Sequence, residues 1–446
     1  MTGMVDVFKN AFKIPDLRKK LVFTMIILTL YRLGASIPVP FINSEMMQAL
    51  FAQQGDSIFG YLNILSGDAF SKATLFALSI SPYITASIVM QLLTIAIPAL
   101  EKMQKSGEDG KKKITQITRY VTVALGLITG YGYYMTCRGY QLVTNRTVFA
   151  GIVIVACYSA GSALIMWLGE KINENGIGNG ISLILFANIV SRLPSWIAGM
   201  IQQIVATIME GAVASVIIQL VRTVIILAVA VVIVAFVVFM SNAERRIPVQ
   251  YSKRMVGRKM YGGQNTYLPI KVNMSGVMPI IFASSMVSIP ATVIRFINAE
   301  PKAGTFAGVM YNIFKTTSPV YMILEFGLII AFAYFYIAIS FNPVEVSNNL
   351  KKNGGFIPGI RPGAPTKDYI TKILNKIVLI GGLFLGVISV FPLLVNSVAS
   401  VINQSWALGA IAFGGSSLLI VVGVAIETTR EIEAQMTMRH YKGFLE

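Results

Sequence analysis

The sequence has little charge, few cysteines and almost no histidine. Only 13% of its 446 residues are charged, whereas 55% are hydrophobic. A soluble protein of this length needs more charge to cover its surface, so the composition indicates a membrane protein. The two cysteines, Cys137 and Cys157, lie in or beside apolar stretches, which favours packing over a disulfide framework or a metal site. The single histidine, His440, leaves almost no imidazole for catalysis.

Motifs for enzymatic chemistry are also missing. The glycines of 176–180 precede an apolar stretch and are not followed by the Lys and Ser or Thr of a phosphate loop. No carboxylate pair or metal-ligand set recurs at helical spacing within the apolar stretches, so we expect neither an enzyme nor a cofactor. Charges near the edges of those stretches are few, and Arg32, Arg222 and Glu325 are expected to snorkel to the interface. This scarcity argues against an ion-coupled transporter.

The sequence does contain ten apolar runs of about the twenty residues that cross a bilayer as a helix. They lie at 21–40, 76–98, 118–137, 149–168, 181–200, 216–240, 274–294, 319–341, 373–395 and 405–426. Lys and Arg outnumber Asp and Glu by 37 to 20, and most fall on one side if the runs alternate in direction. The positive-inside rule then places both termini in the cytoplasm. The segment after Met1 carries Asp6 and Asp16, unlike a targeting peptide, which favours a bacterial plasma membrane.

Two of the inward loops are long and basic. The loop 241–273 carries seven Lys or Arg and one Glu, and the loop 342–372 is rich in Gly, Pro and Lys. Such loops can fix topology or contact anionic lipid. Their length favours a second interpretation, a docking surface for a large acidic or negatively charged partner.

Two further features stay open from the pattern alone. The stretch 58–72 is too short and too polar to span, so it is either a re-entrant helix or an amphipathic helix at the outer surface. Ser, Thr and Gln around Pro82, and serines after Pro279, provide either helix-packing contacts or a water-lined path between helices.

Several motifs, in order along the chain, resemble the SecY family, the pore subunits of the general protein-export channel. They are ALSISPYITASI at 77–88, WLGE at 167–170 with GIGNGIS at 176–182, LPIKVN at 268–273, FNP at 341–343, GIRPG at 359–363 and FGGSSLLIVV at 413–422. The resemblance implies an all-α membrane protein of ten transmembrane helices around an hourglass pore. Its two inverted-repeat halves would be spans 1–5 in residues 1–200 and spans 6–10 in residues 201–446, with a short plug helix.

The resemblance also assigns functional residues. A pore ring of aliphatic side chains would consist of Ile80, Ile84, Ile181, Leu185, Ile281 and Ile420. Bulky apolar side chains dewet a constriction and block ions, yet deform around a passing polypeptide. Leu185 stands where isoleucine is common in bacterial relatives, a change that should conserve the seal.

The plug maps to 58–72, with Asn63, Ser66, Gly67 and Asp68 as its marked residues. Asp68 departs from the usual Ser-Gly-Gly, so its carboxylate is either solvated in the outer funnel or weakens closure.

A lateral gate between spans 2–3 and 7–8 would release signal sequences and membrane helices into lipid. Its seam is assigned to Thr85, Gln91, Ser284 and Ile289. Contacts to the motor SecA or the ribosome are assigned to Arg258, Lys259 and Arg361. Ribosomal RNA would be bound through phosphates in a salt-dependent way. The implied partners are SecE, SecG, SecA, the ribosome, signal peptides, nascent chains and anionic lipid.

Three hypotheses follow from the sequence. The first is a passive protein-conducting channel driven by its partners. The second is a secondary solute transporter, a class that is also built from inverted repeats. The third is a membrane scaffold without a pore.

Overall fold

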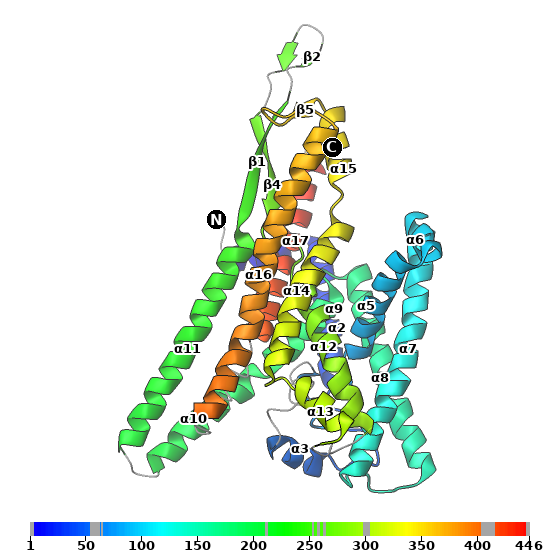
Figure 1. Cartoon of the computed structure of the whole chain (residues 1–446), viewed down its shortest axis with the longest axis vertical. Helices are drawn as coiled ribbons and strands as arrows, with labels where there is room; N and C mark the ends of the chain where they lie inside the picture. The colour runs from blue at the N-terminus through cyan, green and yellow to red at the C-terminus, as the bar shows by residue number, and fades with distance from the viewer. Residues whose placement is uncertain are drawn as a thin grey trace.

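Long helices lie side by side along the molecule, and a narrow β-hairpin projects from one end (Figure 1). The computed structural model describes residues 4–53, 63, 66–209, 213–251, 254–256, 259–261, 265–297, 304–402 and 415–442. In the first part of the chain the helices are α1 (Met4–Lys13), α2 (Pro15–Gly34), α3 (Ser44–Gln53), α5 (Ser81–Ala96), α6 (Pro98–Lys105), α7 (Glu108–Gly139), α8 (Val148–Asn175), α9 (Gly180–Ser191) and α10 (Leu193–Met209). They are followed by α11 (Val213–Asn242), α12 (Met278–Ile297), α13 (Phe306–Ile313), α14 (Pro319–Ser340), α15 (Pro343–Lys352), α16 (Ala364–Ile402) and α17 (Gly415–Lys442).

The predicted membrane segments all overlap helices. Within the described residues, six helices are long and apolar enough to cross a membrane, or up to seven if the pair α5 and α6 is one span bent by 101°. Three other predicted segments overlap α2, α7 and α17, which are not among these six or seven. The first residues of the predicted run 405–426 lie outside the described part. The fold is therefore that of a multi-pass helical membrane protein.

The second predicted segment, 76–98, is wrong at its start. Helix α5 begins at Ser81, with Pro82 in its first turn, and residues 67–80 form successive turns. Proline suits the first turn of a helix because it lacks the N–H that later positions need. Ser79 has a φ of 51°, in the left-handed region, which also stops a helix before Ile80. The chain thus enters the core as turns and becomes helical only inside it.

The Gly-rich segment 176–180 has a structural role. Asn179 precedes α9, and its Oδ1 accepts hydrogen bonds from the backbone N–H groups of Ile181 and Ser182. Gly178 has a φ of 85°, and a Cβ at Gly180 would clash with the carbonyl oxygen of Gly169 in α8. These residues cap α9 and let it approach α8 closely.

A large apolar core joins helices from both ends of the sequence. It contains buried side chains of α2, α5, α8, α9, α11, α12, α14, α16 and α17. Helix α12 packs against α5, α7 and α14, and α17 packs against α9 and α11. A second core, closer to α3 and α13, holds Cys137 and is flanked by Cys157, which confirms that both cysteines serve packing.

Glu325 does not snorkel, contrary to the expectation for a charge near a span edge. Its residue is only 3% exposed, and its Oε1 accepts a hydrogen bond from the Ser389 hydroxyl of α16 at 3.1 Å. The contact between α14 and α16 encloses this carboxyl group, so it lies within the bundle rather than at the interface.

The two long loops fold together instead of remaining separate. Strands β1 (Glu244–Tyr251) and β4 (Asn265–Lys271) form an antiparallel hairpin, and β5 (Gly355–Phe356), from the second loop, pairs with the end of β1. Strands β2 (Arg254–Val256) and β3 (Lys259–Tyr261) pair farther along the same hairpin. Ile247, Val249 and Ile270 pack on α16, which anchors the sheet to the bundle. The sequence did not predict these strands.

Candidate functional site: an aliphatic ring with a flanking plug segment

Five of the six side chains assigned to the pore ring lie on four helices, and Ile80 directly precedes the first of them. Ile84 is on α5, Ile181 and Leu185 are on α9, Ile281 is on α12 and Ile420 is on α17. All six belong to, or pack against, one apolar cluster. Residues far apart in the sequence are therefore brought to one place in the core.

The ring side chains are almost completely withdrawn from solvent. Ile80 is 0% exposed, Leu185 is 1% exposed, and Ile84, Ile281 and Ile420 are buried as well; only Ile181 is half-buried. These aliphatic side chains pack within the apolar core between the helices.

The plug-side residues pack directly beside this cluster. Residues 58–62 and 64–65 of the predicted plug helix lie outside the described residues, and 67–72 form turns rather than a helix. The backbone N–H of Ser71 donates to Oδ1 of Asn63 at 2.9 Å, and the Ser66 hydroxyl donates to the carbonyl of Asn63 at 3.1 Å. Gly67 has a φ of 63° and lies so close to Asn188 of α9 that a Cβ would be 3.0 Å from its backbone. Asn63 and Ser66, which are helical, are thus bonded to the turns that follow, and Gly67 packs against α9. We call Asn63 with residues 66–72 the plug-side turn.

Asp68 is held by a cation. Its Oδ1 lies 3.0 Å from Nε of Arg192, the residue that ends α9, and accepts a hydrogen bond from Nδ2 of Asn63 at 2.9 Å. Nη1 of Arg32 in α2 lies 3.5 Å from the carbonyl oxygen of Gly67. Two arginines from two helices therefore fasten the plug-side turn.

The four residues assigned to the lateral gate lie on two packed helices. Thr85 and Gln91 are on α5, and Ser284 and Ile289 are on α12. Nε2 of Gln91 donates to the Ser87 hydroxyl at 3.3 Å, and the Ser284 hydroxyl donates to the carbonyl of Ile280 at 2.8 Å. Their polar groups are thus bonded within their own helices, while Ile289 is 40% exposed.

Comparison with known proteins identifies the family. The family model of SecY matches residues 74–429. The protein translocase subunit SecY of Streptomyces galbus is 45% identical over 99% of this chain and 100% of its own length. The SecY subunit of Mycobacterium tuberculosis strain H37Rv is 40% identical over the same shares.

The chain belongs to the SecY family. The resemblance drawn from its motifs is confirmed.

Solved structures show the same fold. A protein-conducting channel superposes with a TM-score of 0.65, 18% identity, and coverage of 94% of this chain and 92% of the other. A SecY protein, of which the plug domain is described as stabilising the closed state and maintaining a membrane seal, gives a TM-score of 0.66 with 17% identity over the same shares. Sec61 from a canine ribosome–channel complex gives 0.62 with 17% identity, again over 94% and 92%.

Two of the three contact residues assigned to SecA or the ribosome lie in the described residues, on the β-hairpin or in the loop that follows β5. We call strands β1 to β5 with the loop 357–363 the basic projection. Arg361 is exposed in that loop, Lys259 is in β3, and Arg258 lies outside the described residues. Arg245 and Arg246 are exposed on β1, in the sheet β4-β1-β5, whereas β2 and β3 form a second sheet. The pairing of β1 with β5 therefore joins the two predicted docking loops of this SecY chain into one surface.

Sequence reasoning missed the residues that hold the plug-side turn. Arg192 and Asn188 lie in the predicted span 181–200, and Arg192 was not recognised as a charge within that apolar run. A cation there, together with the unusual Asp68 of this SecY sequence, was the available signal for an ion pair.

Proposed function

We propose that this chain forms the pore of a protein-conducting channel in a bacterial plasma membrane. Its ten helices would be arranged as two inverted-repeat halves, 1–200 and 201–446, around an hourglass pore, with both termini in the cytoplasm. Unfolded preproteins would cross between the halves. Signal sequences and transmembrane helices would leave sideways into lipid.

The observation that carries the proposal is the aliphatic ring. Four helices from both halves place branched apolar side chains in one buried cluster, as a dewetted constriction requires. Such side chains offer no hydrogen bonds to a passing chain, so they can seal around it without retaining it. The seal excludes ions at rest because a narrow apolar passage is costly for a charge to enter.

The plug and the gate are assigned to the elements beside the ring. The turn of Asn63 and 66–72 would carry the plug and would move when a chain passes. The contact between α5 and α12 would open as the lateral gate, and the mixed polar and apolar side chains of Thr85, Gln91, Ser284 and Ile289 suit a seam that meets both lipid and polypeptide.

The energy would come from partners. Relatives and structural neighbours are translocase subunits and ribosome-bound channels, and the exposed arginines of the basic projection suit an acidic motor surface or ribosomal RNA. We assign SecA and the ribosome to this surface, and SecE and SecG to the helical bundle.

Reconstitution tests the proposal. The chain is inserted into vesicles with its small partner subunits and SecA, and protease protection of an export precursor is followed. We expect protection that depends on ATP. Absence of protection together with uptake of a small solute would instead support the secondary solute transporter.

A further inference from the structure

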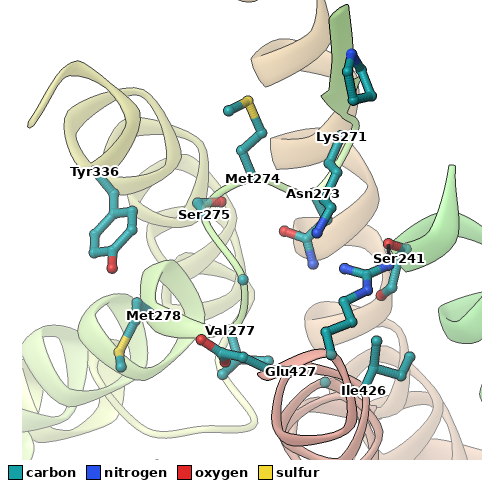
Figure 2. Close-up of a pocket in the computed structure, with 14 residues that line it drawn as sticks. Ser241, Lys271, Asn273, Met274, Ser275, Val277, Met278, Tyr336, Ile426 and Glu427 are labelled. Atoms are coloured by element: carbon teal, nitrogen blue, oxygen red, sulfur yellow. Dashed lines mark hydrogen bonds between the residues drawn. The ribbon is translucent and has the colours of Figure 1, made fainter. Parts of the chain in front are cut away.

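A cavity of about 420 Å³ lies where the basic projection joins the helices. It is lined by residues of the end of α11, the end of β4, the segment 273–277, the start of α12, α14 and α17. Figure 2 shows Ser241, Asn273 and Lys271 on one side and Met278 and Tyr336 on the other. Its volume is within the range of small-molecule sites.

Two cations define the charge of the cavity wall. Arg430 of α17 donates from Nη2 to the carbonyl oxygen of Ser241 and to Oδ1 of Asn242, both at 2.8 Å, which fixes its guanidinium group. A guanidinium group has five N–H donors. Both bonds come from Nη2, so they do not use the N–H groups of Nε and Nη1. Lys271 stands at the rim on a flexible stem. Glu427 is the carboxylate on the wall, so the three side chains together carry one net positive charge.

The wall also contains polar atoms that lack partners within the described part of the chain. The Oγ of Ser241, whose residue is only 5% exposed, and Oδ1 of Asn273 are shielded from solvent without a hydrogen bond. Buried polar atoms nearly always bond to protein, water or a bound group. The first turn of α12 adds a helix N-terminus, where backbone N–H groups and the helix dipole favour an anion.

The position of the cavity and its apolar wall residues indicate which class of ligand it could bind. Met278 begins α12, and Glu427 directly follows the predicted span 405–426, so the cavity is at the depth where membrane segments end. Met274, Val277 and Ile426 line it beside the charged groups. Basic pockets between membrane helices at the cytoplasmic surface suit phosphate headgroups.

We propose that this cavity is a phosphate-binding site and that it holds the headgroup of an anionic phospholipid. The lipid source rests on the proposed orientation, with the basic projection in the cytoplasm. The phosphate would bond to Arg430 and the Ser241 hydroxyl, and Lys271 would close over it. Bound lipid would brace the junction between β4 and α12.

The reactivity of Lys271 reports occupancy directly. Burial, with a further contribution from Arg430, lowers the pKa of Lys271, so its amine reacts readily with an acetylating reagent. A bound phosphate restores the charged form and shields the amine. We expect acetylation of Lys271, read by peptide mass spectrometry, to slow several-fold when phosphate is bound. The exposed Lys351 serves as the reference amine.

Two probes separate the sources of phosphate. The purified chain is labelled in neutral detergent with inorganic phosphate, and in bilayer discs with or without phosphatidylglycerol. Slowing by phosphatidylglycerol alone supports a lipid site, and slowing by both probes supports a site for which phosphate suffices. Equal labelling of Lys271 with and without either probe overturns the proposal, and slowing by inorganic phosphate alone overturns the lipid source.

Matched variants locate the effect. Asn273→Asp places a carboxylate in the cavity, and Ser241→Ala removes the unpartnered hydroxyl; both should abolish or weaken the protection. Asn348→Asp makes the same change on the exposed face of α15 and should leave it intact. Protection that survives both cavity variants refutes the site. This assay needs no translocation, so a failed site and a failed channel are distinguishable.

Discussion

The ion pair between Asp68 and Arg192 should hold the plug-side turn closed. The two side chains are 29% and 28% exposed, so the pair is partly shielded from water and salt. Fully exposed pairs contribute about 0.2–1 kcal/mol, and hydrogen bonds to charged groups about 1.5–3 kcal/mol. We therefore expect the contact to stabilise the closed state by about 1–2 kcal/mol. Its loss would raise the open fraction by about 5–30-fold.

Asp68→Asn tests this with little change to the backbone. Asp68 has a φ of 69°, and asparagine tolerates the left-handed region as well as aspartate does. The new amide can still accept the hydrogen bond from Asn63, so the variant removes the charge alone. The measurement is resting ion conductance of the reconstituted complex in a planar bilayer. We expect about 5–30-fold more leak, with Asp109→Asn, an exposed carboxylate of α7, as the neutral control.

A double-mutant cycle decides whether the pair itself is responsible. Arg192→Gln should raise the leak as Asp68→Asn does, and the double variant should add little to either, because both remove one interaction. Wild-type leak in Asp68→Asn, or fully additive effects in the double variant, would refute the reasoning. In that case the carboxylate is merely solvated.

Three further variants address the ring, the docking surface and the bundle. Serine at Ile80 and Ile281 together should raise resting conductance, because it replaces buried apolar groups with hydroxyls that admit water; an unchanged conductance would rule out the ring assignment. Arg361→Glu should reduce SecA-driven export several-fold while the thermal unfolding temperature stays the same; a parallel loss of folding would make Arg361 structural. Glu170→Gln breaks the two-point contact with an arginine of α7, at 2.8 and 3.0 Å, and should cost about 1–3 kcal/mol of unfolding free energy, whereas Glu174→Gln, at an exposed pair, should cost under about 1 kcal/mol.

The sequence predicted the bundle well because the signal is physical and local. A run of apolar residues such as 216–240 must become a helix in lipid, and α11 spans Val213–Asn242. The run 76–98 was harder, because Pro82 and the left-handed Ser79 break the helix within an apolar stretch. Hydropathy alone does not report such a break.

The ring could be placed only through the motif resemblance. An isoleucine at position 80, 281 or 420 resembles any packing residue, and its contacts depend on how distant helices assemble. The β-hairpin was missed because its residues read as a basic loop, and its pairing with β5 depends on a segment about a hundred residues later. The burial of Glu325 could not be predicted for the same reason. Its hydrogen bond comes from α16, which is distant in the sequence.

The basic projection and the ring are linked by a short and tightly packed segment. Strand β4 ends at Lys271 and α12 begins at Met278, so the chain passes almost directly from the hairpin to the helix that carries Ile281 and Ser284. This segment, 272–277, packs closely against Gly381 of α16 and Gly423 of α17. A Cβ at either glycine would clash with it.

Because residues 272 and 277 lie in close contact with α16 and α17, we expect a displacement of β4 to be passed on to α12 through this short segment. Helix α12 in turn packs against α5, across the assigned gate. A partner that tilts the hairpin would therefore act on the ring and the gate together. The Asp68–Arg192 contact lies at the C-terminal end of α9, whereas Gly178, before the N-terminal end, contacts α17. We therefore expect opening of the assigned gate and release of the plug-side turn to be separate steps. An ion pair that contributes only about 1–2 kcal/mol can break once α12 has moved. It still favours the closed state while no partner is bound to the hairpin.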